Sequence, residues 1–255
     1  MALDHSIRRS LPARAQIPFD QSDLSPTVLR LKFGPRMRLD GDDDSSGFAA
    51  EPKTSLGQSM AQYAKRAETT WLQIREAHFR SLADKSVDPG TAYLRSAKSA
   101  KRHLQGLDSE SEQILQRMDE RSAYIQKART DALRPPTSVG DAQVDAEVRA
   151  MIRAEKNPAK AAAIAKAHPR AVATAPAVLS GLVDEDGKAM GIYGEATNAY
   201  LRATIPNVEE EAAELLDAND QFHRAMTAAN DLTRSIIDFD LADKLHAGSQ
   251  WDQAA

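Results

Sequence analysis

The sequence contains no cysteine, few aromatic residues and no long apolar run. Without cysteine, the chain has no disulfide, no thiolate zinc site, no iron–sulfur cluster and no cysteine nucleophile. No apolar run reaches the roughly 20 residues that a helix needs to span a bilayer, and the first residues lack the apolar core of a secretory signal. We therefore expect no membrane association, and we predict neither a metal site nor a cofactor.

Alanine is abundant, and it has the highest helix propensity of all residues. Aromatic residues make up only 5% of the chain, so few of the residues that favour strands are present. Composition therefore predicts an all-α fold. The net charge of −4 is uneven, because residues 55–135 carry 14 basic and 10 acidic residues whereas residues 136–255 carry 11 and 19. Such asymmetry is typical of proteins with different partners or head-to-tail self-association.

Residues 1–54 contain five of the twelve prolines, separated by polar and charged residues. This composition predicts an extended or disordered arm. Apolar and basic residues alternate over residues 27–39, which is the period of short β-strands. A lone hairpin is marginal in water, so we predict that this β-like patch binds a protein partner by strand addition. The residues predicted to make that contact are Leu29, Leu31, Phe33, Met37 and Leu39.

Residues 55–134 show helical periodicity in two stretches. Apolar residues recur at steps of three and four residues from Leu56 to Leu82, and a turn at residues 88–90 precedes a second stretch at about 91–133. The phase of the second stretch continues through Gly106, which predicts one long helix and hence a long helical hairpin. Ser109 and Glu112 also match a capping box, so two helices are the alternative.

Residues 141–246 are predicted to form a helical domain that begins with three short helices. Asp141 is the expected N-cap of the first, Asn157 caps the second, and the third runs from Pro169 to Gly181. The apolar face of the first helix consists of Val144, Val148, Met151 and Ile152. Short helices broken by prolines predict a small orthogonal cluster.

A helix at 189–203 and a long C-terminal helix complete the predicted domain, and residues 247–255 are predicted to be a tail. Apolar residues from Val208 to Ile236 follow a 4-3-4-3 spacing, which is typical of a coiled-coil seam. Further leucines widen the stripe and favour packing in a helical bundle. This seam can serve packing within one chain or between copies in a homo-oligomer.

The sequence contains no P-loop, dinucleotide-binding loop, nucleophile elbow or metalloprotease motif. Acids from Asp40 to Glu51 occupy positions 1, 3, 5 and 12 of a calcium loop, but position 6 is Ser45 where the turn requires glycine. An acidic linker is the simpler interpretation. Acids at 184–186 are interpreted as a turn, and those at 238–243 as a solvated helix end. An enzyme whose site is assembled only in three dimensions is an alternative hypothesis.

A basic cluster lies on the predicted long helix. Arg95, Lys98 and Arg102 share one helical face, with Lys101 beside them. Such a face can contact phosphates, which dominate nucleic-acid affinity. Because acids follow at 108–112, a solvated helix face is the simpler interpretation. A nucleic-acid-associated protein that uses residues 95–103 and the Arg-rich arm is the alternative function.

Three nearby segments, residues 145–153, 163–168 and 175–182, are rich in Ala, Leu and Arg. They are similar to a segment of small uncharacterised helical proteins that tailed bacteriophages and prophages encode. The resemblance implies context and no functional residues: a phage-encoded protein, in the host cytoplasm during assembly or in the virion. We therefore predict a non-enzymatic structural or assembly protein that uses its arm and helical seams to bind protein partners or itself.

Overall fold

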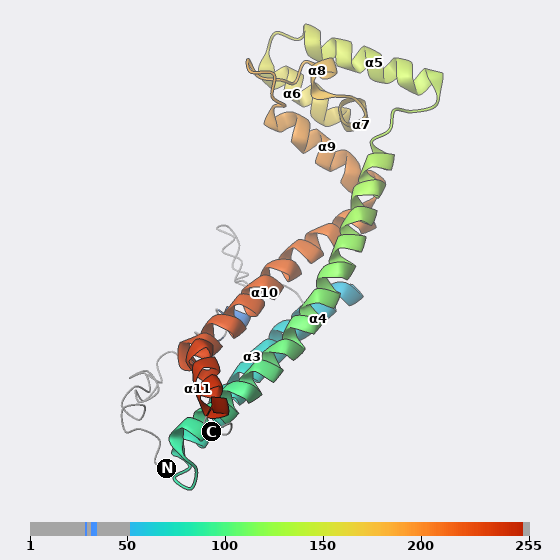
Figure 1. Cartoon of the computed structure of the whole chain (residues 1–255). Coiled ribbons are helices and arrows are strands. Elements are labelled where there is room, and N and C mark those ends of the chain that lie inside the picture. The colour runs from blue at the N-terminus through green and yellow to red at the C-terminus, as the bar shows by residue number, and fades with distance from the viewer. Residues whose placement is uncertain (1–28, 30–31, 35–51, 252–255) are drawn as a thin grey trace, which may run out of the picture. The chain divides into compact units, whose positions relative to one another are not determined.

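The computed structural model describes residues 29, 32–34 and 52–251 (Figure 1). In this part of the chain the fold is helical, which confirms the all-α prediction. The helices are α3 (Ser55–Ala83), α4 (Pro89–Ala132), α5 (Val139–Ala154), α6 (Pro158–Ala167), α7 (Pro169–Ala173), α8 (Ala177–Ser180), α9 (Gly191–Thr204), α10 (Pro206–Ile236) and α11 (Phe239–Trp251). None of these helices is both long and apolar enough to cross a membrane.

The chain divides into two compact units. The long-helix unit comprises the described residues up to 118 and those from 214 onward, and the short-helix unit comprises residues 119–213. The division therefore falls within α4 and within α10. This differs from the predicted domains 55–134 and 141–246, because most of the C-terminal helix belongs with the helical hairpin.

Within the long-helix unit, α3 and α4 form the predicted antiparallel hairpin. His78 Nδ1 near the end of α3 lies 2.9 Å from Ser96 Oγ near the start of α4. Farther from the turn, Arg66 forms an ion pair with Glu110 at 3.0 Å. A late residue of α3 thus contacts an early residue of α4, and an earlier residue of α3 contacts a later residue of α4. The two helices therefore run antiparallel, as in a hairpin.

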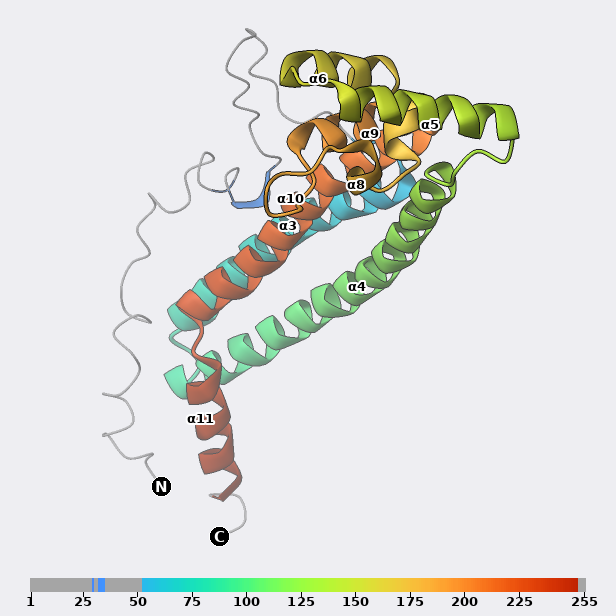
Figure 2. The same ribbon diagram turned by 90° about the horizontal axis from the view of Figure 1, so that it is seen from above.

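The α10 helix runs parallel to α3 in the same unit (Figure 2). The backbone N of Thr54, the N-cap of α3, donates to Glu214 Oε1 at 2.7 Å. Farther along both helices, the ring of Tyr63 tilts against that of Phe222, with centroids 4.8 Å apart. The buried members of the predicted seam are Leu215, Phe222, Ala229, Thr233 and Ile236. This seam therefore packs inside the long-helix unit.

The α4 helix is continuous through Gly106, so the alternative of two helices is wrong. Leu104 and Leu107, on either side of the glycine, are both buried. Burying a leucine side chain contributes about 1.5–3 kcal/mol, which exceeds the roughly 1 kcal/mol that a glycine costs inside a helix. Packing therefore holds the helix together across this weak point.

Leu29, Lys32 and Phe33 in the N-terminal arm are helical, so the predicted strand is wrong at Leu29 and Phe33. Residues four apart share a face of a helix as well as a face of a strand. Phe33 is only 2% exposed, and its carbonyl oxygen accepts a hydrogen bond from Gln221 Nε2 on α10 at 3.0 Å. Phe33, predicted to bind a partner, therefore packs on its own chain. The other predicted arm residues, Leu31, Met37 and Leu39, lie outside the described residues, as does the acidic run 40–51.

In the short-helix unit, helices α5 to α9 surround a small core. Its buried members are Val148, Ile152, Ala165, Ala171, Val172, Leu182 and Ala196. Asn157 caps α6 as predicted, since its Oδ1 accepts from Ala159 N at 3.0 Å. Two expectations were wrong: Ser138, not Asp141, is the N-cap of α5, and the third predicted helix is split into α7 and α8. Pro176 at the split lacks the N–H that a continuing helix requires.

The predicted tail at 247–255 is also wrong for its first residues, because α11 continues to Trp251. Asp238 lies between α10 and α11, and its Oδ1 accepts from the backbone N of Leu241 at 3.0 Å. This contact satisfies a free N–H at the start of α11. Asp238, interpreted from the sequence as part of a solvated helix end, therefore begins a new helix.

Candidate functional site

The buried residues of α5 differ in part from the predicted ones. Val148 and Ile152 are buried as expected, but Val144 and Met151 are more than half exposed. The third buried position on this face is Asp145, which is 3% exposed. A carboxylate therefore occupies a position that an apolar residue usually fills, and such a group requires charged or hydrogen-bonding partners.

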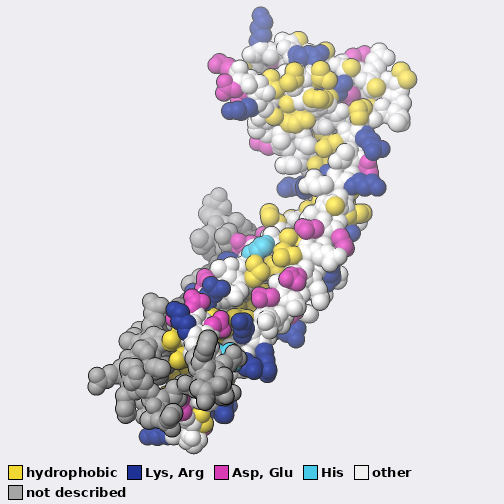
Figure 3. Space-filling model, viewed as in Figure 1, with side chains coloured by type: hydrophobic (Ala, Val, Ile, Leu, Met, Phe, Trp, Pro, Cys, Tyr) yellow, Lys and Arg dark blue, Asp and Glu magenta, His cyan; other side chains and the backbone are white. Residues whose placement is uncertain are grey.

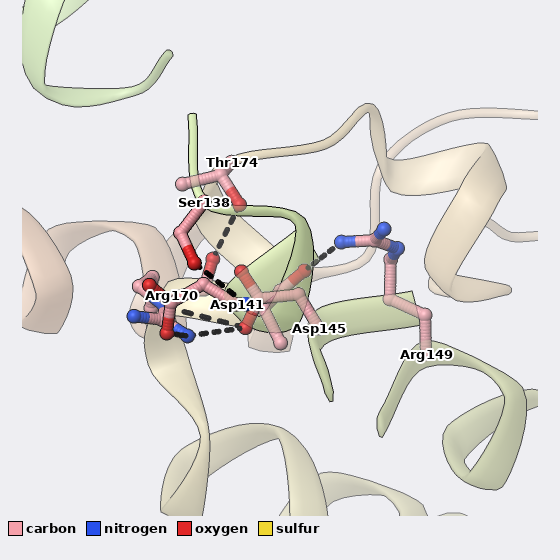
Figure 4. A network of polar contacts seen from close by, with 7 residues as sticks. Ser138, Asp141, Asp145, Arg149, Arg170 and Thr174 are labelled. Atoms are coloured by element: carbon pink, nitrogen blue, oxygen red, sulfur yellow. Dashed lines mark hydrogen bonds and ion pairs between the residues drawn. The ribbon is translucent and has the colours of Figure 1, made fainter. Parts of the chain in front are cut away.

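Arg170 on α7 is the partner of Asp145 (Figure 4). Its Nη2 lies 3.1 Å from Asp145 Oδ1 and 3.1 Å from Asp141 Oδ1, and its Nε lies 3.2 Å from Asp145 Oδ1. The hydrogen bond to Asp145, more than the partial desolvation that opposes it, raises the pKa of the Arg170 guanidinium. Asp145 Oδ2 is buried and has no hydrogen-bond partner among the described residues. One guanidinium thus joins a buried and a half-exposed carboxylate of α5 to α7.

Three further hydrogen bonds hold the segment after Arg170 in place. Arg149 Nη1 on α5 donates to the carbonyl oxygen of Ala171 at 2.9 Å (Figure 4). Thr174 Oγ1 donates to the carbonyl of Arg170 at 2.9 Å. Tyr193 Oη on α9 donates to the carbonyl of Ala175 at 3.0 Å. The backbone leading into α8 is therefore fixed from both α5 and α9.

The α8 helix presents two adjacent aliphatic side chains to solvent. Val178 is 64% exposed and Leu179 is 51% exposed, whereas Ser180 beside them is fully buried. Gly181 ends the helix in the left-handed region with φ 69°, and a Cβ there would lie 2.8 Å from Arg153 Cγ on α5. The Arg153 guanidinium in turn donates to the carbonyl of Leu179. Figure 3 shows hydrophobic side chains gathered over α8 and its surroundings.

Two ion pairs join the ends of α4 and α10 that belong to the short-helix unit. Arg129 Nε lies 2.7 Å from Glu209 Oε1, and its Nη2 lies 2.9 Å from Glu209 Oε2. Arg121 binds Glu211 with the same two-pronged geometry. Such bidentate pairs fix orientation as well as adding attraction, so these two helix ends have a defined register.

The residues predicted to contact nucleic acid lie on α4 within the long-helix unit. Arg95, Lys98, Lys101 and Arg102 are all exposed on α4. The buried residues of the same segment include Tyr93, Ala97, Ala100 and Leu104. The basic side chains are thus on the solvent side of the helix.

A histidine–serine pair is buried in the long-helix unit, but its hydrogen bonds are those of a structural contact. His78 is 1% exposed, and Ser96 Oγ donates to the carbonyl oxygen of Tyr93 at 2.9 Å. The hydroxyl proton of Ser96 is therefore committed to that carbonyl, and His78 Nδ1 must donate to Ser96 Oγ. A general base would need the opposite direction of donation. Burial lowers the pKa of His78.

The acids at 184–186 form a turn, as interpreted from the sequence. Asp184 Oδ1 accepts from the backbone N of Asp186 at 3.0 Å and from that of Lys188 at 2.8 Å. Gly187 in this turn has φ 77°. Over the described residues, no three His, Asp or Glu side chains are grouped closely enough to hold a metal ion.

Sequence reasoning missed the Asp141–Asp145–Arg170 network, although a signal was present. The two aspartates are four residues apart on a predicted helix, and Asp145 lies on the same face as Val148 and Ile152. An acid on an apolar face indicates a buried partner, but the sequence does not say which of the nearby arginines that partner is. No family model, no curated protein and no solved structure matches this chain.

Proposed function

We propose that this chain is a non-enzymatic structural or assembly protein, of the kind that tailed bacteriophages encode, and that it acts as a homo-oligomer. The observation that carries the proposal is the pair of exposed aliphatic side chains on α8, Val178 and Leu179. The resemblance of residues 145–182 to phage-encoded helical proteins supports the phage context. The host cytoplasm during assembly, and the virion thereafter, are the proposed locations.

The α8 pair suits binding because its backbone is already fixed. Val178 and Leu179 lie on a turn whose backbone is held by several contacts. These contacts involve Gly181, Arg153 and the hydrogen bonds around Arg170. A surface that is ordered before binding loses little conformational entropy when it binds. Completing the burial of two half-exposed aliphatic side chains contributes roughly 1 kcal/mol each. A repeated contact of this size is useful in an assembly with many copies.

A second copy of the chain is the occupant that we propose for this surface. An apolar pair needs no charge complementarity, so the same patch on two copies is self-complementary about a twofold axis. The seam of α10 is already used inside the long-helix unit, and Phe33 is buried there too. The α8 surface is therefore the better basis for contact between copies than the seam or Phe33.

The test is the mass of the full-length protein in solution, measured by sedimentation equilibrium over a range of concentrations. We expect the wild-type mass to be a multiple of 27.8 kDa, and the double variant Val178→Asp/Leu179→Asp to return to the monomer mass. The matched control is Leu216→Asp, which alters a leucine on α10 that is 71% exposed and should leave the mass unchanged. Far-UV circular dichroism verifies that all three proteins fold.

Two results would contradict the proposal. A wild-type chain that is monomeric at every concentration would exclude self-association. An oligomer that persists in the α8 double variant would place the contact elsewhere. Loss of the oligomer in Leu216→Asp alone would assign the contact to the exposed side of α10.

A further inference from the structure

We infer that the exposed face of α4 between Arg95 and Arg102 binds the phosphate backbone of duplex nucleic acid without reading its sequence. This surface, called the basic strip here, consists of Arg95, Lys98, Lys101 and Arg102. It lies in the long-helix unit and is separate from the α8 surface in the short-helix unit. The inference does not rest on the proposed function.

The geometry of α4 places three of the four cations in a row. Arg95, Lys98 and Arg102 are spaced three and four residues apart, so they stand on one side of the helix. Arg95 and Arg102 are seven residues apart, which corresponds to about 10 Å along the axis. Each strand of duplex DNA carries one phosphate per about 3.4 Å of its axis. Three cations in such a row can therefore contact up to three phosphates of the duplex backbone.

Three of the four positive charges of the strip are not paired with an acid in the described part of the chain. Lys98, Lys101 and Arg102 have no ion pair there, in contrast to Arg66 and Arg80 on α3, which pair with Glu110 and Glu76. Arg95 is near Asp84. Hydrogen bonds from Ser86 are the main cause of the lowered pKa of Asp84, and the charge of Arg95 contributes less. No acidic residue occurs between Asp88 and Asp108. Local positive charge thus stands out on a chain whose net charge is −4.

Of the three acids that follow the strip, Asp108 and Glu110 interact with residues of α3, whereas Glu112 is exposed on α4. Glu110 is bound to Arg66 on α3, and Asp108 and Glu110 lie close enough to the Tyr63 hydroxyl to help burial raise the pKa of Tyr63 to about 12. The outer side of α4 continues instead with Gln105, Ser109 and Gln113, which are uncharged and exposed. The ion pair of Glu110 with Arg66 therefore removes part of the repulsion that the sequence predicts from the acids at 108–112.

Nucleic acid fits this face better than an anionic membrane does. A helix that binds a membrane surface inserts an apolar face next to its basic one, whereas the apolar face of this segment is buried in the core through Ala97, Ala100 and Leu104. The strip also lacks the aromatic side chains that stack on unpaired bases. What remains is contact with phosphates alone, which favours a duplex and confers no sequence preference.

The test uses the full-length protein and a fluorescent duplex DNA of mixed sequence, followed by anisotropy from 50 to 200 mM salt. With about three phosphate contacts, affinity should fall about 40-fold over this range, a slope of log K against log salt near −3. The triple variant Arg95→Gln/Lys98→Gln/Arg102→Gln should lose most binding at 50 mM salt. The single variant Lys98→Gln should reduce the slope by about 1.

The matched control neutralises three other exposed cations of the same unit, Lys65, Arg234 and Lys244. This control triple has the same net charge as the strip variant and should bind DNA as the wild type does. Equal loss of binding in both triples would show a dependence on net charge only and would overturn the inference. So would binding that does not change with salt, or stronger binding to phosphatidylserine vesicles than to DNA. The oligomer mass of each variant is measured in parallel. Failure of the α8 proposal can then be distinguished from failure of DNA binding.

Discussion

At the scale of single residues, the short-helix unit depends on a charge placed where an apolar side chain is usual. Asp145 stands on the core face of α5 between the helix start and Val148, and Arg170 neutralises it. Replacing one member of such a pair leaves a buried charge without its partner, which costs far more than the pair itself contributes. The network is therefore a source of specificity: it fixes which turn of α7 faces which turn of α5.

We predict that Arg170→Met destabilises the protein by about 2–3 kcal/mol. This is below the usual cost for a fully buried pair, because the Arg170 side chain is 40% exposed and water can partly solvate Asp145 in its place. The double variant Asp145→Asn/Arg170→Met should recover most of this loss, and Asp141→Asn alone should cost less than about 1 kcal/mol, since Asp141 is 48% exposed. Urea unfolding measures all three. If the double variant is no more stable than Arg170→Met, the charge of Asp145 is not what Arg170 neutralises.

At the scale of helices, most of the fold could be read from the sequence because helical period, proline and glycine are local signals. The long helix α4 and the start of α6 at Asn157 are examples. The errors arose where a pattern fits two structures or depends on distant contacts. Leu29 and Phe33 suit a strand or a helix equally, and only the packing of Phe33 on α10 decides between them. Asp145 is buried and Val144 is exposed because Arg170 lies beside Asp145 in the fold. The local sequence around residue 145 does not predict the position of Arg170.

The continuity of α4 gives a prediction at this scale. A Cβ at Gly106 would meet no atom within 4 Å, and this glycine does not have a positive φ. Gly106→Ala should therefore stabilise the protein by about 0.5–1 kcal/mol by raising helix propensity at no steric cost. Gly181→Ala is the contrasting variant, because its φ of 69° and the nearby Arg153 side chain make a Cβ unfavourable there. Thermal unfolding should show opposite shifts, and a lower midpoint for Gly106→Ala would indicate a functional bend in α4.

At the scale of the whole molecule, the two units are stabilised in different ways, and pH distinguishes them. The long-helix unit has a large aromatic core in which Trp71, Tyr63, Tyr93 and Phe222 are almost completely buried. The short-helix unit has a small aliphatic core, together with ion pairs between arginines and carboxylates. Histidine is the residue that titrates near neutral pH, and a fully buried one, His78, lies in the long-helix unit against Tyr93.

Stability should therefore fall below pH 6.5 through the long-helix unit. Burial lowers the pKa of His78 in the folded state, so below its unfolded value of 6.5 the unfolded chain binds the proton more readily. The contribution of His78 is complete above pH 6.5 and is lost as pH falls towards the folded pKa, at up to about 1.4 kcal/mol per pH unit. Urea unfolding of wild type and His78→Phe between pH 5 and 7.5 tests this, because their difference isolates the histidine. The wild type should lose more stability than the variant on acidification; equal losses would mean that His78 is already protonated or solvated in the folded protein.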